Sequence, residues 1–159
     1  MAEYTASVNA TSNGTANTDD MFIEIKAPTS TTVLVKRIRV SSPATTPADN
    51  EVLVTVTRNT GAGTFTSGTG FTPIKRRTSA PVSVITSSTC IVKNGTNGAT
   101  VGAGASVVLK TAFNQRGIFE WIARDKDDYI ETGSGEYIEV LVQCSAVSQK
   151  IAVEMDWEE

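Results

Sequence analysis

Two segments of the chain alternate strictly between apolar side chains and other residues. Residues 51–58 place three valines on one face of an extended strand, at Val52, Val54 and Val56. Residues 150–158 do the same with four apolar side chains, at Ile151, Val153, Met155 and Trp157. A period of two residues is that of a β-strand, whose successive side chains point to opposite sides of the sheet. Both segments are therefore predicted to be strands with one face in a core.

Shorter apolar runs between turn-forming residues predict further strands. They cover residues 22–26, 31–40, 81–85, 89–93, 105–113, 117–122 and 136–143. Turn-forming residues such as Gly, Pro, Asn and Asp separate these runs at short intervals, and no segment has the 3.6-residue period of a helix. The pattern predicts an all-β protein, an antiparallel β-sandwich of about ten short strands.

The composition agrees with this pattern. Thr, Val and Ile together make up 51 of the 159 residues, whereas Leu occurs only four times. Side chains branched at Cβ suit a pleated sheet and lose rotamer freedom in a helix. A chain of this length forms one domain with a core of its own.

The first nineteen residues differ from the rest, because Thr, Ser, Asn and Ala dominate them. A segment of low hydrophobicity buries too little apolar surface to offset the entropy of ordering it. We therefore expect an extended N-terminal arm over 1–19, with an edge strand around Tyr4 to Val8, followed by a single β-sandwich domain over 20–159.

Neither a membrane span nor a secretory signal is expected. No apolar run approaches the roughly 18 residues of a spanning helix. The first residues, MAEYTASVNA, contain neither a basic patch nor the apolar run of a signal peptide. We expect a protein made in the cytoplasm, where Cys90 and Cys144 stay reduced and pack as small apolar side chains. A disulfide between them would depend on the separation of their Cα atoms.

The charged and reactive residues argue against an enzyme. The net charge is −3 and histidine is absent, so the chain lacks the commonest general base and metal ligand. The glycine-rich segment 59–72 has no lysine where a phosphate-binding loop requires one, and it is expected to be an exposed loop. The acidic run at 125–128 lacks the glycine and the terminal glutamate of a calcium-binding EF-hand. We expect no catalytic residue, no metal and no cofactor.

A run of three cations, Lys75 to Arg77, is the strongest candidate for binding. With Phe65 and Phe71 upstream, it could stack on and neutralise a nucleic acid. It could instead be a solvated basic edge, or it could contact an acidic protein. The net acidic charge argues against a nucleic-acid partner. Residues 1–80 carry a net charge of +2 and residues 81–159 one of −5, a separation that favours oriented association with another copy or with a shell.

Several motifs give the chain a family resemblance. It begins Met-Ala-x-Tyr-Thr, continues with Val-x-x-Ile-Arg-Val at 35–40 and Phe-Thr-Pro-Ile-Lys at 71–75, and reaches Ala-Phe-Asn-x-Arg-Gly-Ile-Phe-Glu-Trp at 112–121. It ends in Trp-Glu-Glu. This order of motifs resembles the all-β head decoration (cement) proteins of tailed bacteriophages. The Pro-x-x-Glu-Glu-Arg turn expected after residue 121 is missing, which leaves the role of that turn in doubt.

The resemblance implies a structural virion protein rather than an enzyme. Such a protein would have a jelly-roll-like fold and bind the major capsid protein shell from outside, as a homotrimer at three-fold positions. It would have neither a nucleic-acid nor a membrane partner. The residues expected at the capsid or subunit interface are Tyr4, Val8, Phe65, Phe71, Lys75, Arg76 and Arg77. A tail or fibre subunit and a carbohydrate-binding or adhesion module remain the alternatives.

Overall fold

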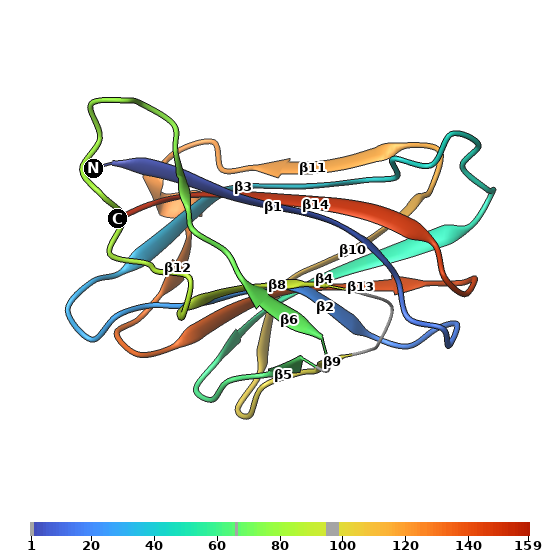
Figure 1. The fold of residues 1–159 in the computed structure, drawn as a ribbon, viewed down its shortest axis with the longest axis horizontal. Helices are drawn as coiled ribbons and strands as arrows, with labels where there is room; N and C mark the ends of the chain where they lie inside the picture. Colours follow the sequence, from blue (N-terminus) through green and yellow to red (C-terminus); the bar gives the residue numbers. More distant parts are fainter. Residues whose placement is uncertain (1, 66, 95–98) are drawn as a thin grey trace.

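Two antiparallel sheets lie face to face in the computed structural model, which describes residues 2–65, 67–94 and 99–159 (Figure 1). Sheet A contains, in spatial order, β11 (Ile118–Ile122), β3 (Val33–Ser41), β14 (Lys150–Glu158), β1 (Glu3–Thr11) and β7 (Ile74–Lys75), with β12 (Ile130–Thr132) also paired to β3. Sheet B contains β10 (Ser106–Asn114), β4 (Glu51–Asn59), β13 (Tyr137–Cys144), β2 (Asp20–Lys26), β8 (Cys90–Lys93) and β6 (Gly68–Gly70). The all-β antiparallel sandwich predicted from the alternation is confirmed. The jelly-roll connectivity stays a prediction.

A two-stranded ribbon covers part of sheet B. It pairs β5 (Thr64–Phe65) with β9 (Ala99–Thr100) and lies on the side of sheet B that faces away from sheet A (Figure 1). Sheet A has no such cover in this view. The ribbon is what makes the outer faces of the two sheets different.

The core fills the space between the sheets. The valines of β4 and the apolar side chains of β14 point into it, as their period of two predicts. The rings of Tyr4 and Trp157 pack there with centroids 6.2 Å apart. Its largest fully buried side chains include Trp157, Tyr4, Phe22, Ile25, Ile38 and Met155.

The first strand corrects the expected domain boundary. β1 pairs with β14 over its whole length, from Glu3 opposite Glu158 to Thr11 opposite Lys150. Residues 3–11 are therefore a strand of the sandwich and not an arm outside it. Tyr4, Ala6 and Val8 alternate inward, and β14 supplies the hydrogen bonds and further large side chains beside them.

Two further segments differ from the sequence-based expectation. Residues 81–85 form no strand. They belong to a long loop, 76–89, that passes close to both chain ends (Figure 1). Pro81, within this loop, has no backbone N–H to donate to a neighbouring strand. The segment 59–72 is not a plain loop, since it contains β5 and β6. The two Asn-Gly pairs at 94–95 and 97–98 predict tight turns, but they fall mostly outside the residues that the structure describes.

Both cysteines are free and buried, as packing residues should be. Burial raises the pKa of the Cys90 thiol to about 12. The charged segment after β11 forms a 3₁₀ turn, η1 (Lys126–Asp128), and the described residues contain no α-helix. Within the described ranges, no helix has the length and apolar character needed to cross a membrane.

Candidate functional site

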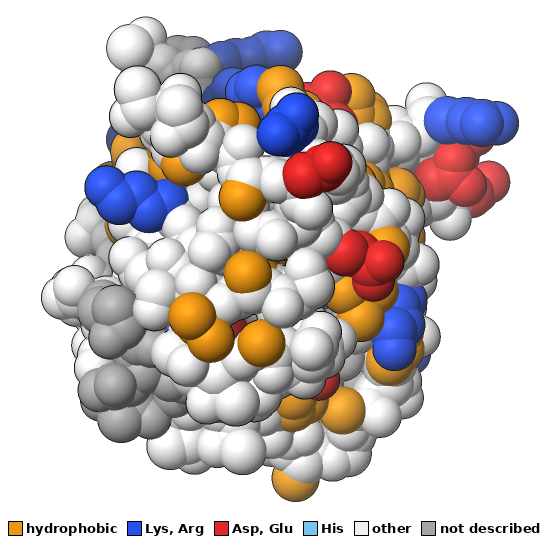
Figure 2. Space-filling view, turned by 90° about the vertical axis from the view of Figure 1, so that its right-hand side faces the viewer, with side chains coloured by type: hydrophobic (Ala, Val, Ile, Leu, Met, Phe, Trp, Pro, Cys, Tyr) orange, Lys and Arg blue, Asp and Glu red, His pale blue; other side chains and the backbone are white. Residues whose placement is uncertain are grey.

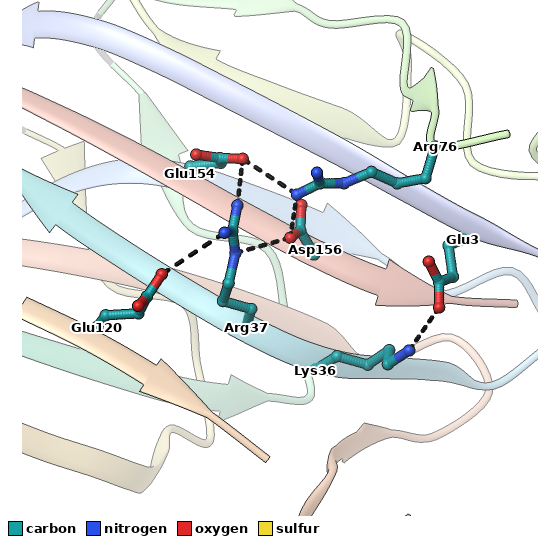
Figure 3. Close-up of polar contacts among 7 residues, drawn as sticks. All are labelled: Glu3, Lys36, Arg37, Arg76, Glu120, Glu154 and Asp156. Carbon is teal, nitrogen blue, oxygen red and sulfur yellow. Dashed lines mark hydrogen bonds and ion pairs between the residues drawn. The ribbon is translucent and has the colours of Figure 1, made fainter. Parts of the chain in front are cut away.

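Charged side chains gather on the outer face of sheet A (Figure 3). We call this group the sheet A charge cluster; it consists of Glu3, Lys36, Arg37, Arg76, Glu120, Glu154, Asp156 and Glu158. Four strands and the residue after β7 contribute to it. The alternation that turns apolar residues inward turns these residues outward.

A register irregularity places two neighbouring cations in the cluster. Asp156 lies opposite Arg37 and Trp157 lies opposite Val35, so Lys36 has no direct partner in the pairing of β14 with β3. An extra residue of this kind is a β-bulge, which re-aims the side chains around it. Lys36 and Arg37 can therefore both face outward although they are adjacent in the sequence.

Two arginines bracket two carboxylates at the centre of the cluster. Arg37 forms ion pairs with Glu154, with Asp156 at 2.8 Å and with Glu120 at 3.5 Å. Arg76 reaches the same pair, contacting Asp156 and lying 3.2 Å from Glu154. Each central carboxylate thus has two cationic neighbours, which fixes the arginine side chains in place.

Lys36 forms the second part of the cluster. Its Nζ donates to Glu3 at 2.6 Å and to Glu158 at 2.9 Å. The hydrogen bond with Glu3 raises the pKa of Lys36, and the hydrogen bond from Lys36 lowers the pKa of Glu3. These contacts tie β3 to the start of β1 and the end of β14.

The structure separates the three predicted cations. Arg76 belongs to the sheet A charge cluster, whereas Lys75 lies in β7 opposite Tyr4 and Arg77 lies exposed in the loop 76–89. Because Arg76 is neutralised by Glu154 and Asp156, the run does not form a continuous basic patch. The run 75–77 therefore offers less free positive charge for binding phosphate groups.

The predicted aromatic partners do not join these cations. Phe65 lies in the β5–β9 ribbon beyond sheet B, on the other side of the sandwich from Arg76 (Figure 1). Phe71 is half-buried and packs against the core. A platform that combines Phe65, Phe71 and the basic run is therefore not assembled.

The structure places the side chains of Tyr4 and Val8, both expected at an interface, in the core. Their exposed fractions are 1% and 9%, because both side chains point between the sheets. Tyr4 also donates its hydroxyl hydrogen to the carbonyl of Pro81 at 3.1 Å. Both side chains therefore pack mainly between the sheets rather than on an exposed surface.

A hollow of about 750 Å³ lies where the loop 76–89 crosses the two chain ends. Glu159 holds this loop, since its carboxylate accepts hydrogen bonds from the Val84 N–H at 2.8 Å and from Ser83. Val82 and Val84 are exposed beside it. Sequence reasoning missed this hollow because its lining comes from four segments that are distant in the sequence.

The edge strands β10 and β11 carry a second exposed apolar group. β10 ends sheet B, β11 ends sheet A, and residues 115–117 join them. Phe113 and Phe119, on either side of this turn, lie with ring centroids 6.2 Å apart. We call this region the β10–β11 edge; its exposed apolar residues are Val107, Val108, Ile118 and Ile122.

The longest motif of the sequence, 112–121, spans the corner of this edge. Gln115 is buried there, accepting from the Asn50 side chain at 3.2 Å and donating to Ser42 at 3.2 Å. The Gly117 N–H donates to the Asn114 carbonyl at 2.8 Å. The motif therefore makes a rigid corner that joins the two sheets and holds Ile118 at the surface.

The end of the sandwich away from the chain termini is mostly polar (Figures 1 and 2). The connections 12–19, 42–50, 115–117 and 145–149 gather at the end that Figure 2 presents to the viewer. White polar and backbone atoms cover most of that surface, and the apolar side chains form small separate patches. Among the described residues that this view shows, the side chains form no continuous apolar surface (Figure 2).

Chemical groups that support catalysis or metal binding are scarce. In the part of the chain that the structure describes, no three His, Cys, Asp or Glu side chains are grouped so that they could hold a metal. Comparison of the chain with protein families, with curated proteins and with solved structures found no match.

Proposed function

We propose that the protein is a non-enzymatic structural protein of a tailed-bacteriophage virion. It binds the outer surface of the capsid, stabilises the shell and acts as a homotrimer at three-fold positions. The order of motifs from the Met-Ala-x-Tyr-Thr start to the Trp-Glu-Glu end supports this family. The protein would be made in the host cytoplasm and function on the assembled virion.

The observation that carries the proposal is the β10–β11 edge. Two open strand edges lie next to each other there, and Ile118 is 59% exposed. Open edges with apolar side chains are liable to pair with other chains, so stable proteins cover them with a partner. A trimer that buries this edge in each subunit would cover it.

The sheet A charge cluster supports a mechanical role. Its carboxylates and cations neutralise one another across β1, β3, β11 and β14. The closely packed core between the two sheets lets the sandwich transmit force between its neighbours with little change of shape. In a trimer, the first contact with the shell would raise the effective concentration of the other two subunits at the shell. Three weak contacts would then act together.

The mass in solution tests the trimer. We expect the wild-type protein to elute at three times the chain mass in light-scattering chromatography, and the variant Ile118→Asp to elute as a monomer with an unchanged melting temperature. Val147→Asp is the matched control, because Val147 is an exposed valine in the β13–β14 turn, away from the edge. A monomeric wild-type protein would contradict the proposed trimer.

Sedimentation with purified particles tests the capsid role. We expect the wild-type protein to co-sediment with assembled shells and to bind free capsid subunits much more weakly, because the binding surface would span several subunits. Equal binding to shells and free subunits would contradict this mechanism. Filaments or rings with no affinity for shells would favour a tail or fibre subunit instead.

A further inference from the structure

Two glutamates face each other on the covered side of sheet B. Glu24 of β2 and Glu139 of β13 are direct register partners, and their exposed fractions are 6% and 0%. Neither forms an ion pair with any residue that the structure describes. Buried carboxylates are normally paired with a cation or bound to a metal. This pair therefore requires an explanation.

The segments that cover sheet B supply hydrogen bonds to both carboxylates. The Gly63 N–H donates to Glu24 Oε2 at 2.6 Å, and the Gly102 N–H donates to Glu139 at 3.0 Å. Thr57 donates its hydroxyl to Glu139 at 3.3 Å. The carboxylates thus connect the sheet to two loops that are distant in the sequence.

Further oxygen atoms converge on the same place. A Cβ atom at Gly63 would lie 2.7 Å from Glu139 Oε1 and 2.8 Å from the carbonyl oxygen of Thr100. A Cβ atom at Gly102 would lie 2.8 Å from Glu139 Oε1, and the carbonyl of Gly61 is closer still. The glycines let the two loops approach the carboxylates, and the loops bring their carbonyl oxygens with them.

Asn59 is the independent sign of a missing partner. Its side chain is 1% exposed, and neither its amide nitrogen nor its amide oxygen has a hydrogen-bond partner. A Cβ atom at Gly102 would lie 2.9 Å from Asn59 Nδ2 as well as beside Glu139, so the amide borders the carboxylate site. An unpartnered buried amide destabilises the folded state, because it has lost its hydrogen bonds to water.

Two arrangements would relieve the repulsion of the glutamates. They could share a proton, since burial and the neighbouring Glu139 raise the pKa of Glu24 to about 7. They could instead hold a cation between them. A shared proton leaves the Asn59 amide oxygen without a partner. A cation bound beside Glu139 satisfies the carboxylates and, with the Asn59 amide turned so that Oδ1 takes the place of Nδ2 beside Glu139, the amide oxygen as well.

We propose that Glu24, Glu139 and Asn59 bind a calcium ion that fastens the loops 60–65 and 99–104 to the outer face of sheet B. Calcium accepts carboxylate, amide and backbone carbonyl oxygens in flexible geometry, and its charge matches the two carboxylates. Magnesium demands a near-ideal octahedron and retains its water, which suits this closed site less well. The carbonyl oxygens of Thr100 and Gly61 are the further ligands within the site.

A calcium titration of the full chain tests the proposal. At pH 7.5, after removal of metal with EDTA, calorimetry should show one binding event per chain. Calcium at about 100 times its Kd should raise the melting temperature by roughly 5–10 °C. Magnesium should produce a much smaller shift.

Variants assign the effect to the site. Glu139→Gln and Asn59→Ala should abolish or strongly weaken the calcium-dependent shift. Asp127→Asn should retain it, because Asp127 belongs to the exposed acidic turn η1. If a variant fails to fold, the wild-type titration alone decides.

The shared proton is the competing outcome. In that case calcium neither releases heat nor changes the melting temperature of the wild-type protein, and Glu139→Gln raises the melting temperature equally with calcium and with EDTA. A shift that Asp127→Asn removes would place the ion in the acidic turn. Either result would overturn the proposal.

Discussion

The outer faces of the two sheets hold their charged residues in opposite environments. On sheet A, Arg37 and Arg76 meet Glu154 and Asp156 at a partly exposed surface. On sheet B, Glu24 and Glu139 lie under the β5–β9 ribbon, and Asp20 pairs with Lys93 at 2.7 Å with both side chains buried. Charges in water interact weakly, whereas buried charges depend strongly on their partners. The same alternation of strand residues therefore produces one face where losing a charge partner costs little stability and another where the same loss costs much.

Removing one cation from each face should give the largest contrast. Lys93→Met leaves Asp20 buried without its cation, so we expect the free energy of unfolding to fall by about 3–5 kcal/mol. Lys36→Met is the matched change on sheet A, where the partly exposed pairs with Glu3 and Glu158 contribute about 1 kcal/mol or less. Urea denaturation of both variants measures the difference, and equal losses would refute the contrast.

The pH dependence of stability should have opposite signs on the two faces. Burial raises the pKa of Glu24 from 4.5 to about 7 and also raises the pKa of Asp20, so the folded state binds more protons than the unfolded state between these values. Stability in EDTA should therefore fall by on the order of 3 kcal/mol as the pH rises from about 4.5 to about 7.

Glu3 on sheet A has a lowered pKa because Lys36 donates to it, so its contribution is present above pH 4.5 and is lost in more acidic solution. The titratable groups that face the sheet B carboxyls are Glu139 beside Glu24 and Lys93 beside Asp20. Glu24→Gln should reduce the loss of stability that accompanies the rise from about pH 4.5 to about pH 7. A decline of unchanged size in this variant would show that Glu24 is not its source.

A smaller loss of stability should follow from replacing a glycine that lets the β5–β9 ribbon lie close to sheet B. A Cβ atom at Gly63 would lie 2.6 Å from Met21 Cε and 2.8 Å from the Thr100 carbonyl oxygen, so Gly63→Ala must displace the ribbon. We expect a loss of about 1–3 kcal/mol. Gly14→Ala, with nothing within 4 Å, should be neutral or slightly stabilising. Thermal denaturation separates the two, and similar behaviour would mean that the ribbon is loosely held.

The smallest effect should follow from opening the sheet A charge cluster. Arg76→Gln removes one of the two cations beside Glu154 and Asp156, but Arg37 remains in contact with both. We expect a change of less than about 1 kcal/mol that becomes smaller still in 1 M NaCl, because salt screens exposed charges. A large loss that is independent of salt would show that the cluster acts as a buried network.

The sequence alone determined the class of fold and the position of most long strands. β4 and β14 were predictable because a period of two is a local property of the backbone, and burial of one face follows from it. The free, buried cysteines were predictable for a similar reason, since thiols in strands pack as apolar groups. The corner at 112–121 was visible as a motif, although its role in joining the sheets was not.

Only the tertiary structure decided which strands are neighbours and which outer face is covered. Residues 3–11 resemble a polar arm until β14 is placed beside them, and Arg76 resembles a free cation until Glu154 and Asp156 face it. Glu24 and Glu139 stand at alternate positions that normally meet water, so nothing in their local pattern indicates burial. Their environment is created by loops 60–65 and 99–104, whose approach depends on contacts between residues far apart in the chain.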